Sequence, residues 1–334
     1  MLKNLLIRLL TIAITLYGVA VVVFFLIRVA PGNPIAMMLP PGASEQDIAN
    51  LTALYGFDKP LTDQFWIWIG GILHGDFGTS ITLKQSVASL VLGRLPATLE
   101  LSLLALIIAL ALGGFTAVLG ARERGRATEG GVDLFNSAAL SIPDFLWGLL
   151  LILLFGVVWP VLHISGRVSP QLDLPFSTQF YLIESVLRLR FDLLGDLLAH
   201  MLMPALALAL PLSAVVSQLL KQGLKDVLQL DYTVLARVKG FSETQVILRE
   251  ALRNAALPTL TLVGVQFTFL IGGTVIVERL FAYEGLGNMA IDAVINRDLP
   301  LIQGIVLMFA CIFIFVNLFV DIAYTFLNPR LRHG

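Results

Sequence analysis

The chain has 334 residues, of which 57% are apolar and 13% are charged, and its mean hydropathy is +0.87. Soluble domains are about half apolar and a quarter charged, so this composition indicates an integral membrane protein in contact with lipid. The net charge of −1 gives no electrostatic reason to expect a nucleic-acid partner. The single cysteine, Cys311, excludes an internal disulfide.

Six segments are long and apolar enough to span a membrane, which takes roughly 20 mostly apolar residues. They are Leu9–Val29, Leu95–Gly120, Leu134–Val161, Leu197–Leu220, Ala255–Val277 and Leu301–Leu327. The first continues beyond the ~7–15 apolar residues of a signal peptide, so we expect it to be a retained anchor. The fourth contains Pro204 and Pro211, which are tolerated where neighbouring helices satisfy the freed carbonyls.

Lysine and arginine gather in alternate connecting segments. If the N-terminus lies inside, the inside segments are the two termini and residues 121–133 and 221–254. They hold most of the 22 basic residues although they are shorter in total than the outside segments. The positive-inside rule therefore predicts a multi-pass protein with both termini in the cytoplasm.

The outside segment 30–94 is too long for a simple connection. Ser44 and Asp47 form a capping pattern before a helix predicted at Ile48–Tyr55, and Thr62 is the expected N-cap of a second helix ending at Leu73. The expected organisation is an N-terminal helix (1–29), a small outer helical subdomain (30–94) and a five-helix core (95–334).

The inside segment 221–254 contains the strongest helix signals outside the spans. Asp231 is the expected N-cap of a helix over Tyr232–Lys239, and Gly240 ends it. Ser242 and Gln245 form a capping box that opens a second short helix. The alternative is an ordinary loop whose basic residues only set the topology.

Polar side chains inside the spans are candidates for lining a transport pathway. They are Glu100, Asp144, Gln218, Gln266, Asn317 and Asp321. Glu100 either lines the outer mouth or pairs with Arg94, and Asp144 is expected to be a solvated acid at a helix end. Asn317 and Asp321 share a helix face and contact either another helix or substrate. The two glutamines face either the pathway or a neighbouring helix.

Several kinds of site have no matching sequence pattern. The four histidines are scattered without metal-ligand spacing, so no metal site is predicted. No phosphate-binding G-x-x-x-x-G-K-[ST] occurs, so no ATP site and no cofactor are predicted for this chain. A membrane-embedded protease or lipid transferase is disfavoured because H-E-x-x-H and G-x-S-x-G are missing from the sequence. An ion-coupled secondary transporter would show inverted repeats, and no convincing repeat is seen.

Short motifs along nearly the whole chain resemble one family. They are Phe25–Pro34 (FLIRVAPGNP), Tyr55–Leu61, His74–Ser80, Arg94–Leu101, Ser141–Phe145, Ala236–Ser242 (ARVKGFS), Leu252–Ala255, Phe281–Gly287 (FAYEGLG), Arg297–Leu301, Asn317–Asp321 and Asn328–Arg330. In this order they resemble the inner-membrane permeases of bacterial peptide-type ABC importers. This is the dipeptide, oligopeptide and nickel group, and the likeness is greatest to its first, or "B", permease.

The resemblance implies an all-α fold with six transmembrane helices, the type I importer permease fold, in the bacterial inner membrane. It implies a second, similar permease, two ATPase subunits that bind ATP and magnesium, and a periplasmic or lipid-anchored substrate-binding protein. The cargo stays open among dipeptides, longer peptides, a nickel chelate, haem and glutathione.

The segment 221–254 then resembles the EAA loop that couples a permease to its ATPases. The family's E-A-A slots hold Val234, Leu235 and Ala236, so only the last matches, and Gly240 supplies the glycine. The resemblance implies seven coupling residues: Asp231, Tyr232, Ala236, Arg237, Lys239, Gly240 and Ser242. Arg237 and Lys239 are expected to pair with acidic groups of the ATPase.

Overall fold

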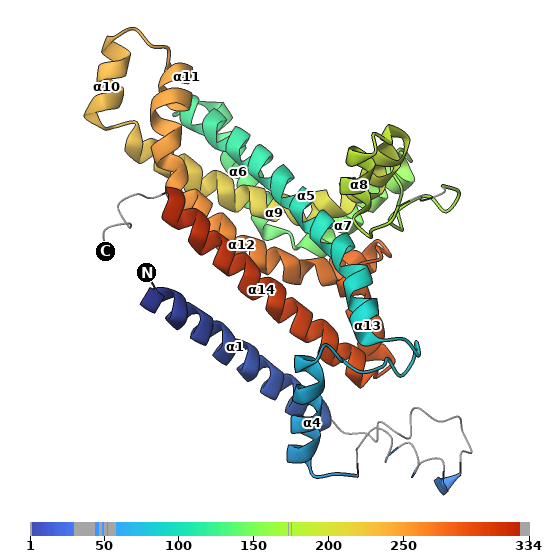
Figure 1. Cartoon of the computed structure of the whole chain (residues 1–334). Coiled ribbons are helices and arrows are strands. Elements are labelled where there is room, and N and C mark those ends of the chain that lie inside the picture. Colours follow the sequence, from blue (N-terminus) through green and yellow to red (C-terminus); the bar gives the residue numbers. More distant parts are fainter. Residues whose placement is uncertain are drawn as a thin grey trace. The chain divides into compact units, whose positions relative to one another are not determined.

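The computed structural model describes residues 2–29, 58–172, 174 and 176–327, with residues 44–46, 49 and 52. Within these residues all regular secondary-structure elements longer than a single residue are helices (Figure 1). They form two compact units, Met1–Leu95 with Asn288–Phe315 (unit 1) and Pro96–Gly287 with Val316–Gly334 (unit 2). The predicted helix Ile48–Tyr55 falls almost entirely outside the described residues, so the predicted outer subdomain stays a prediction.

Unit 1 contains α1 (Leu2–Val29) and α4 (Leu61–Leu73), which pack through aromatic rings. Phe24 of α1 lies with its ring centroid 5.2 Å from Phe65 and 5.4 Å from Trp68 of α4. The prediction that Thr62 caps α4 is wrong. The N-cap is Pro60, two residues earlier, because its carbonyl already accepts the first helical N–H bonds, from Asp63 and Gln64.

A buried carboxylate organises the rest of unit 1, which includes most of α13 (Leu286–Ile295) and the first part of α14 (Leu299–Leu327). Asp298 accepts hydrogen bonds from the Ser80 hydroxyl at 2.5 Å and from the Thr82 N–H at 3.0 Å. Its other oxygen accepts from the Leu301 N–H at 3.3 Å, which caps the N-terminus of α14. The segment before α5 is thereby fixed to α14.

Unit 2 is built around α9 (Phe191–Val227), which packs against α6 (Ala127–Ser141), α7 (Asp144–Leu151), α8 (Tyr181–Leu187) and α12 (Leu252–Leu280). The helix runs unbroken through Pro204 and Pro211, which confirms the fourth predicted span. Also α5 (Val87–Arg122) packs against it, since the Thr116 hydroxyl donates to Ser217 of α9 at 2.9 Å. Packing against these helices stabilises α9 at the two positions where proline removes a backbone hydrogen bond.

The third predicted span is not one straight helix. Leu134–Val161 was expected to be continuous, but α6 and the helix formed by α7 and η1 (Ile152–Val158) meet at 104°. The break lies at Ile142-Pro143. Proline disfavours the helical conformation of the preceding residue, and Ile142 is extended, with φ −97° and ψ 122°.

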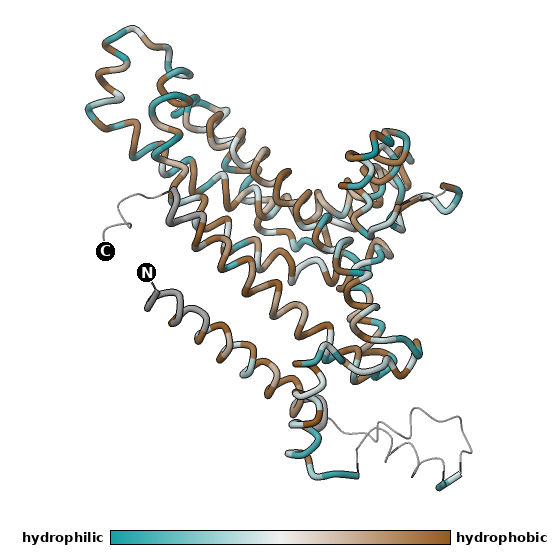
Figure 2. The backbone as a smooth tube through the Cα atoms, viewed as in Figure 1, coloured by the Kyte–Doolittle hydropathy of each residue, from teal (hydrophilic) through white to brown (hydrophobic). Residues whose placement is uncertain are grey.

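In the described part of the chain, four helices are long and apolar enough to cross a membrane: Val87–Arg122, Phe191–Val227, Glu243–Leu280 and Leu299–Val320. Counting the bent α6–α7 pair as one span brings the number to five. The described apolar part of α1 is Leu10–Phe25, shorter than a full span, so the first predicted span stays a prediction. Apolar residues follow these helices, while polar residues are more frequent at their ends and in the connecting segments (Figure 2).

Candidate functional site

The loop between α9 and α12 carries a short helix, α10 (Asp231–Val238), at one end of unit 2 (Figure 1). The prediction that Asp231 caps this helix is wrong, because Leu230 occupies the N-cap and Asp231 lies in the first turn. A carboxylate there still interacts favourably with the helix dipole. Gly240 ends the helix with φ +87°, as predicted.

The predicted capping box is confirmed. The Gln245 N–H bonds to the Ser242 hydroxyl at 3.4 Å, and the Ser242 N–H bonds to the Gln245 side chain at 2.9 Å. The second helix, however, is not short. It runs from α11 (Glu243–Gln245) through a π-helical segment, η2 (Val246–Ala251), into α12, as one helix over Glu243–Leu280. The loop is therefore joined directly to a long helix of unit 2.

Hydrogen bonds within the loop hold α10 in place. Arg237 bonds to both carboxylate oxygens of Glu243, at 2.8 and 3.0 Å, and to the Leu228 carbonyl at 3.1 Å. The Glu243 carboxylate raises the pKa of Arg237. The Tyr232 hydroxyl accepts from Asn254 of α12 at 2.8 Å. Arg237, expected to pair with another subunit, is thus engaged inside its own loop.

An apolar surface on α10 faces outward. Val234, Leu235 and Val238 are 47%, 52% and 78% exposed, and we call these three residues the α10 face. Ala236 is buried on the opposite side of the helix, so the matching residue of the E-A-A slots supports the loop from within. The exposed Lys239 borders the α10 face. An exposed apolar group on a projecting loop is typical of a protein interaction site.

An open cavity of about 300 Å³ lies at the surface of unit 2, where the α6–α7 break meets α9 and α12. Its walls are mostly apolar, formed by residues such as Pro143, Pro211 and Phe269, and its polar side chains are Asp144 and Gln266. Two of the six predicted pathway residues therefore meet here from helices far apart in sequence. Asp144, expected to be a solvated acid at a helix end, is the first residue of α7, and its half-buried side chain also lines this cavity.

A glycine makes room for the cavity's carboxylate. A Cβ at Gly273 of α12 would lie 2.9 Å from Oδ2 of Asp144, closer than side-chain atoms normally approach. The other carboxylate oxygen accepts a bond from the Phe145 N–H at 2.8 Å, at the start of α7. The break at Pro143 therefore places a fixed acid at the cavity wall.

Two family models together match nearly the whole chain. The binding-protein-dependent transport system inner membrane component matches residues 109–333, and its N-terminal counterpart matches residues 1–102. The chain belongs to this permease family. It is therefore a multi-pass inner-membrane permease of an ABC importer and not an ion-coupled secondary transporter. The family consists of transport permeases and not of catalytic subunits.

Curated relatives of the permease align over its full length. It is 36% identical to the di/tripeptide transport system permease protein of Pseudomonas aeruginosa, over 96% of this chain and 95% of the relative. It is 37% identical to the dipeptide transport system permease protein of Escherichia coli strain K12, over 100% and 99%. It is 36% identical to the glutathione transport system permease protein of Salmonella choleraesuis, over the whole of both chains.

Three of the remaining predicted pathway residues of the permease are not among those that line the cavity. Glu100 is buried and pairs with Arg167 at 2.8 Å, while its other oxygen accepts from the N–H groups of Leu182 and Ile183. Gln218 is exposed on α9 and Asn317 is half-buried on α14. The side chain of Asp321 lies outside the described part of the chain.

Sequence reasoning missed two buried glutamates. Glu278 of α12 accepts from the Thr98 hydroxyl at 2.7 Å, and Thr98 accepts from the Leu286 N–H at 2.8 Å. A Cβ at Gly285 would overlap the Glu278 carboxylate, which explains the glycine in Phe281–Gly287. The Phe281–Gly287 motif was the sequence feature that could have identified the Glu278 site.

The second missed residue is Glu184, which organises the outer loop before α9. The Thr178 hydroxyl donates to it at 2.6 Å, and the Ser177 N–H donates at 2.9 Å. These bonds, the Thr178 hydroxyl foremost, lower the pKa of Glu184 to about 2. The Glu184 carboxylate therefore keeps its charge far below neutral pH. The polar run Ser177-Thr178 just before α8 was the available signal.

Proposed function

We propose that the permease forms half of a translocation pathway for di- or tripeptides and related small peptides such as glutathione. A second, similar permease completes the pathway, two ATPases supply the energy, and a binding protein delivers the substrate. The full-length similarity to di/tripeptide, dipeptide and glutathione permeases supports this substrate class. The α10 face is the proposed ATPase contact. The nearby coupling residues that were predicted from the sequence hold this face in position.

One observation carries the coupling proposal: a single helix bears both the loop and the cavity wall. The helix Glu243–Leu280 begins at the capping box next to α10 and presents Gln266 and Gly273 to the cavity. A rigid helix transmits displacement of one end to the other. Movement of an ATPase bound to the α10 face is thus delivered directly to the cavity.

The chemistry of the cavity fits a small peptide. The Asp144 carboxylate attracts the ammonium group of a peptide N-terminus, and the Gln266 amide can both donate to and accept from a peptide group. The apolar walls tolerate varied side chains, since they make no directional bonds. We assign selectivity among peptides mainly to the binding protein.

A charge placed on the α10 face tests the coupling proposal. Val238→Glu puts a carboxylate where we expect an apolar contact, and burying an unpaired charge is costly. We expect ATPase affinity to fall at least tenfold, measured by co-purification of the ATPases with the membrane complex. Uptake of a radiolabelled dipeptide should fall in parallel, while the amount of inserted permease stays at the wild-type level.

A matched control is available on α8. Leu187 is 77% exposed, against 78% for Val238, so Leu187→Glu adds the same charge at an equally exposed aliphatic residue. This variant should keep both the ATPases and uptake. Wild-type co-purification and uptake in Val238→Glu would refute the role of the α10 face. Equal losses in both variants would show that added charge, and not its position, causes the defect.

A further inference from the structure

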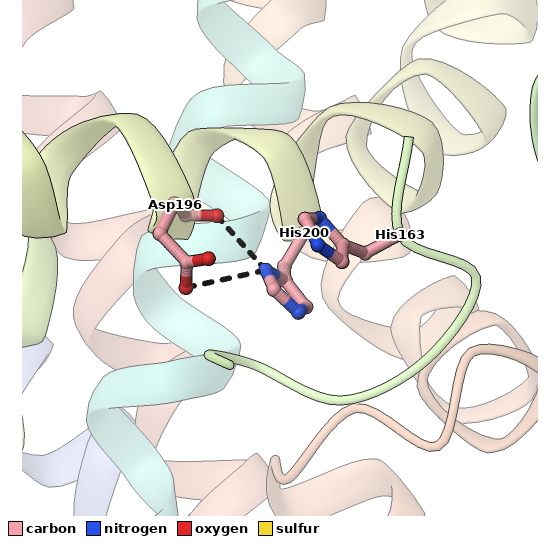
Figure 3. A group of neighbouring side chains, drawn as sticks. All are labelled: His163, Asp196 and His200. Carbon is pink, nitrogen blue, oxygen red and sulfur yellow. Dashed lines mark hydrogen bonds and ion pairs between the residues drawn. The ribbon is translucent and has the colours of Figure 1, made fainter. Parts of the chain in front are cut away.

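Three potential metal ligands that are separated in the sequence meet in unit 2. His163 lies in the loop after η1, and Asp196 and His200 lie one turn apart on α9 (Figure 3). The two imidazole rings stack with centroids 4.0 Å apart and planes inclined by 6°. One ligand atom from each residue lies within 4.8 Å of the others. The transport pathway and the coupling loop use none of these residues.

Two of the three side chains are held in place by hydrogen bonds. The Asp196 carboxylate accepts from the Ser169 hydroxyl at 2.6 Å and from the Ser169 N–H at 2.8 Å. The His200 ring bonds through Nδ1 to the Asp196 backbone carbonyl at 2.9 Å. A carbonyl can only accept, so Nδ1 carries the proton, and it also lies 3.5 Å from Oδ2 of Asp196, which leaves Nε2 as the ligand atom of His200 (Figure 3). A bond from the second ring nitrogen to a carbonyl is a common feature of metal-binding histidines.

We propose that His163, Asp196 and His200 form a binding site for a divalent transition-metal ion of the zinc class. Two imidazoles and one carboxylate suit zinc or its neighbours better than magnesium or calcium, which prefer all-oxygen sites. Zinc bonds of about 2.0–2.2 Å place ligand atoms roughly 3.4 Å apart in a tetrahedron. His163 is exposed and free of the bonds that fix the other two side chains, so its ring can rotate toward them, and metal binding also requires the ligand atoms of Asp196 and His200 to approach each other.

The proposed site keeps one position open. Three protein ligands leave a fourth place for water or a substrate group, as in sites where zinc is accessible. Because His163 belongs to the loop and the other two ligands to α9, a bound ion would tie this loop to the central helix. Metal binding should therefore raise the thermal stability of unit 2.

The test uses the purified full-length chain carrying a tag without histidine, titrated with Zn²⁺ against a chromophoric chelator. We expect one high-affinity Zn²⁺ per chain and an increase in melting temperature on Zn²⁺ addition. Loss of a residue that hydrogen-bonds to a metal ligand typically lowers metal affinity about 10–100-fold. Removal of a ligand should cost at least as much, so His163→Ala and Asp196→Asn should each weaken binding at least tenfold.

His163→Ala is the principal variant because its side chain is exposed and its removal leaves the hydrogen bonds of Asp196 and His200 intact. His74→Ala, which removes an exposed histidine of unit 1, is the control and should bind Zn²⁺ like the wild type. The proposal is overturned if the wild type binds no Zn²⁺ or if His163→Ala binds it equally well. Binding is measured without ATPases or transport, so either result leaves the coupling proposal standing.

Discussion

Glu100 is buried in unit 2 against partners that the fold holds in place. Arg167 supplies the cation, and it is itself fixed by the Gln179 carbonyl at 2.7 Å and by the Tyr181 ring, 3.9 Å below its guanidinium. The pair joins α5 to the loop before α8. Such a pair adds little net stability over apolar residues, but breaking it strands a buried charge.

Replacement of Arg167 should therefore destabilise the permease strongly. We expect Arg167→Met to lower the free energy of unfolding by about 3–5 kcal/mol, because Glu100 stays buried without its cation. The measurement is the melting temperature in detergent micelles. The double variant Glu100→Gln with Arg167→Met should recover part of the loss, since no unpaired charge remains. A single variant as stable as the wild type would contradict the structural role of the pair.

The contacts of individual polar residues could be predicted from the sequence only in part. Glu100 was recognised as a candidate, but its partner Arg167 lies 67 positions away, and no local pattern links the two. The meeting of Asp144 with Gln266 and that of His163 with His200 have the same cause. Spacing along one helix predicts neighbours on that helix, whereas these contacts depend on how separate helices pack.

At the scale of the element, Gly240 sets the turn between α10 and the helix that begins at Glu243. Its φ of +87° lies in the left-handed region, and a Cβ there would meet no atom within 4 Å. Substitutions at this position therefore act through backbone conformation and not through a clash. Side chains other than glycine cost roughly 1–2 kcal/mol in this region, with asparagine the best tolerated.

We expect Gly240→Val to reduce peptide uptake severely while the permease still inserts into the membrane. The branched residue shifts the backbone out of the left-handed region and turns the α10 face away from its partner. Gly240→Asn should retain most of the uptake, because asparagine accepts this conformation. Uptake and ATPase co-purification are measured together. Equal activity of the two variants would show that the turn geometry does not matter for coupling.

Helix ends were predicted well where a side chain caps them and poorly elsewhere. Ser242 and Gln245 marked a real boundary, because a capping box satisfies two N–H groups locally. Prolines were ambiguous. Pro211 is accommodated inside α9, while Pro143 ends α6 with a 104° bend. The difference lies in the packing around each segment: α9 packs against α5, α6, α7, α8 and α12, whereas the bend at Pro143 lies at the open cavity.

At the scale of the whole molecule, the orientation in the membrane decides which ends meet which partners. Figure 1 shows α8 and α10 at opposite ends of unit 2. The bias of lysine and arginine predicts that α10 lies in the cytoplasm, where ATPases are found, and that α8 lies outside. The proposed zinc site lies in the loop between η1 and α9 that contains α8, so the same orientation exposes it to the periplasm.

Cysteine labelling tests this orientation with the two exposed residues already matched. Leu187→Cys and Val238→Cys are made separately in a Cys311→Ala background, which removes the single native thiol. A membrane-impermeant maleimide should label position 187 in intact spheroplasts and position 238 only after lysis, while a permeant maleimide labels both. The reverse pattern would place α10 outside, beyond the reach of any cytoplasmic ATPase. The coupling proposal would then fail whatever the effect of Val238→Glu, and the zinc site would face the cytoplasm.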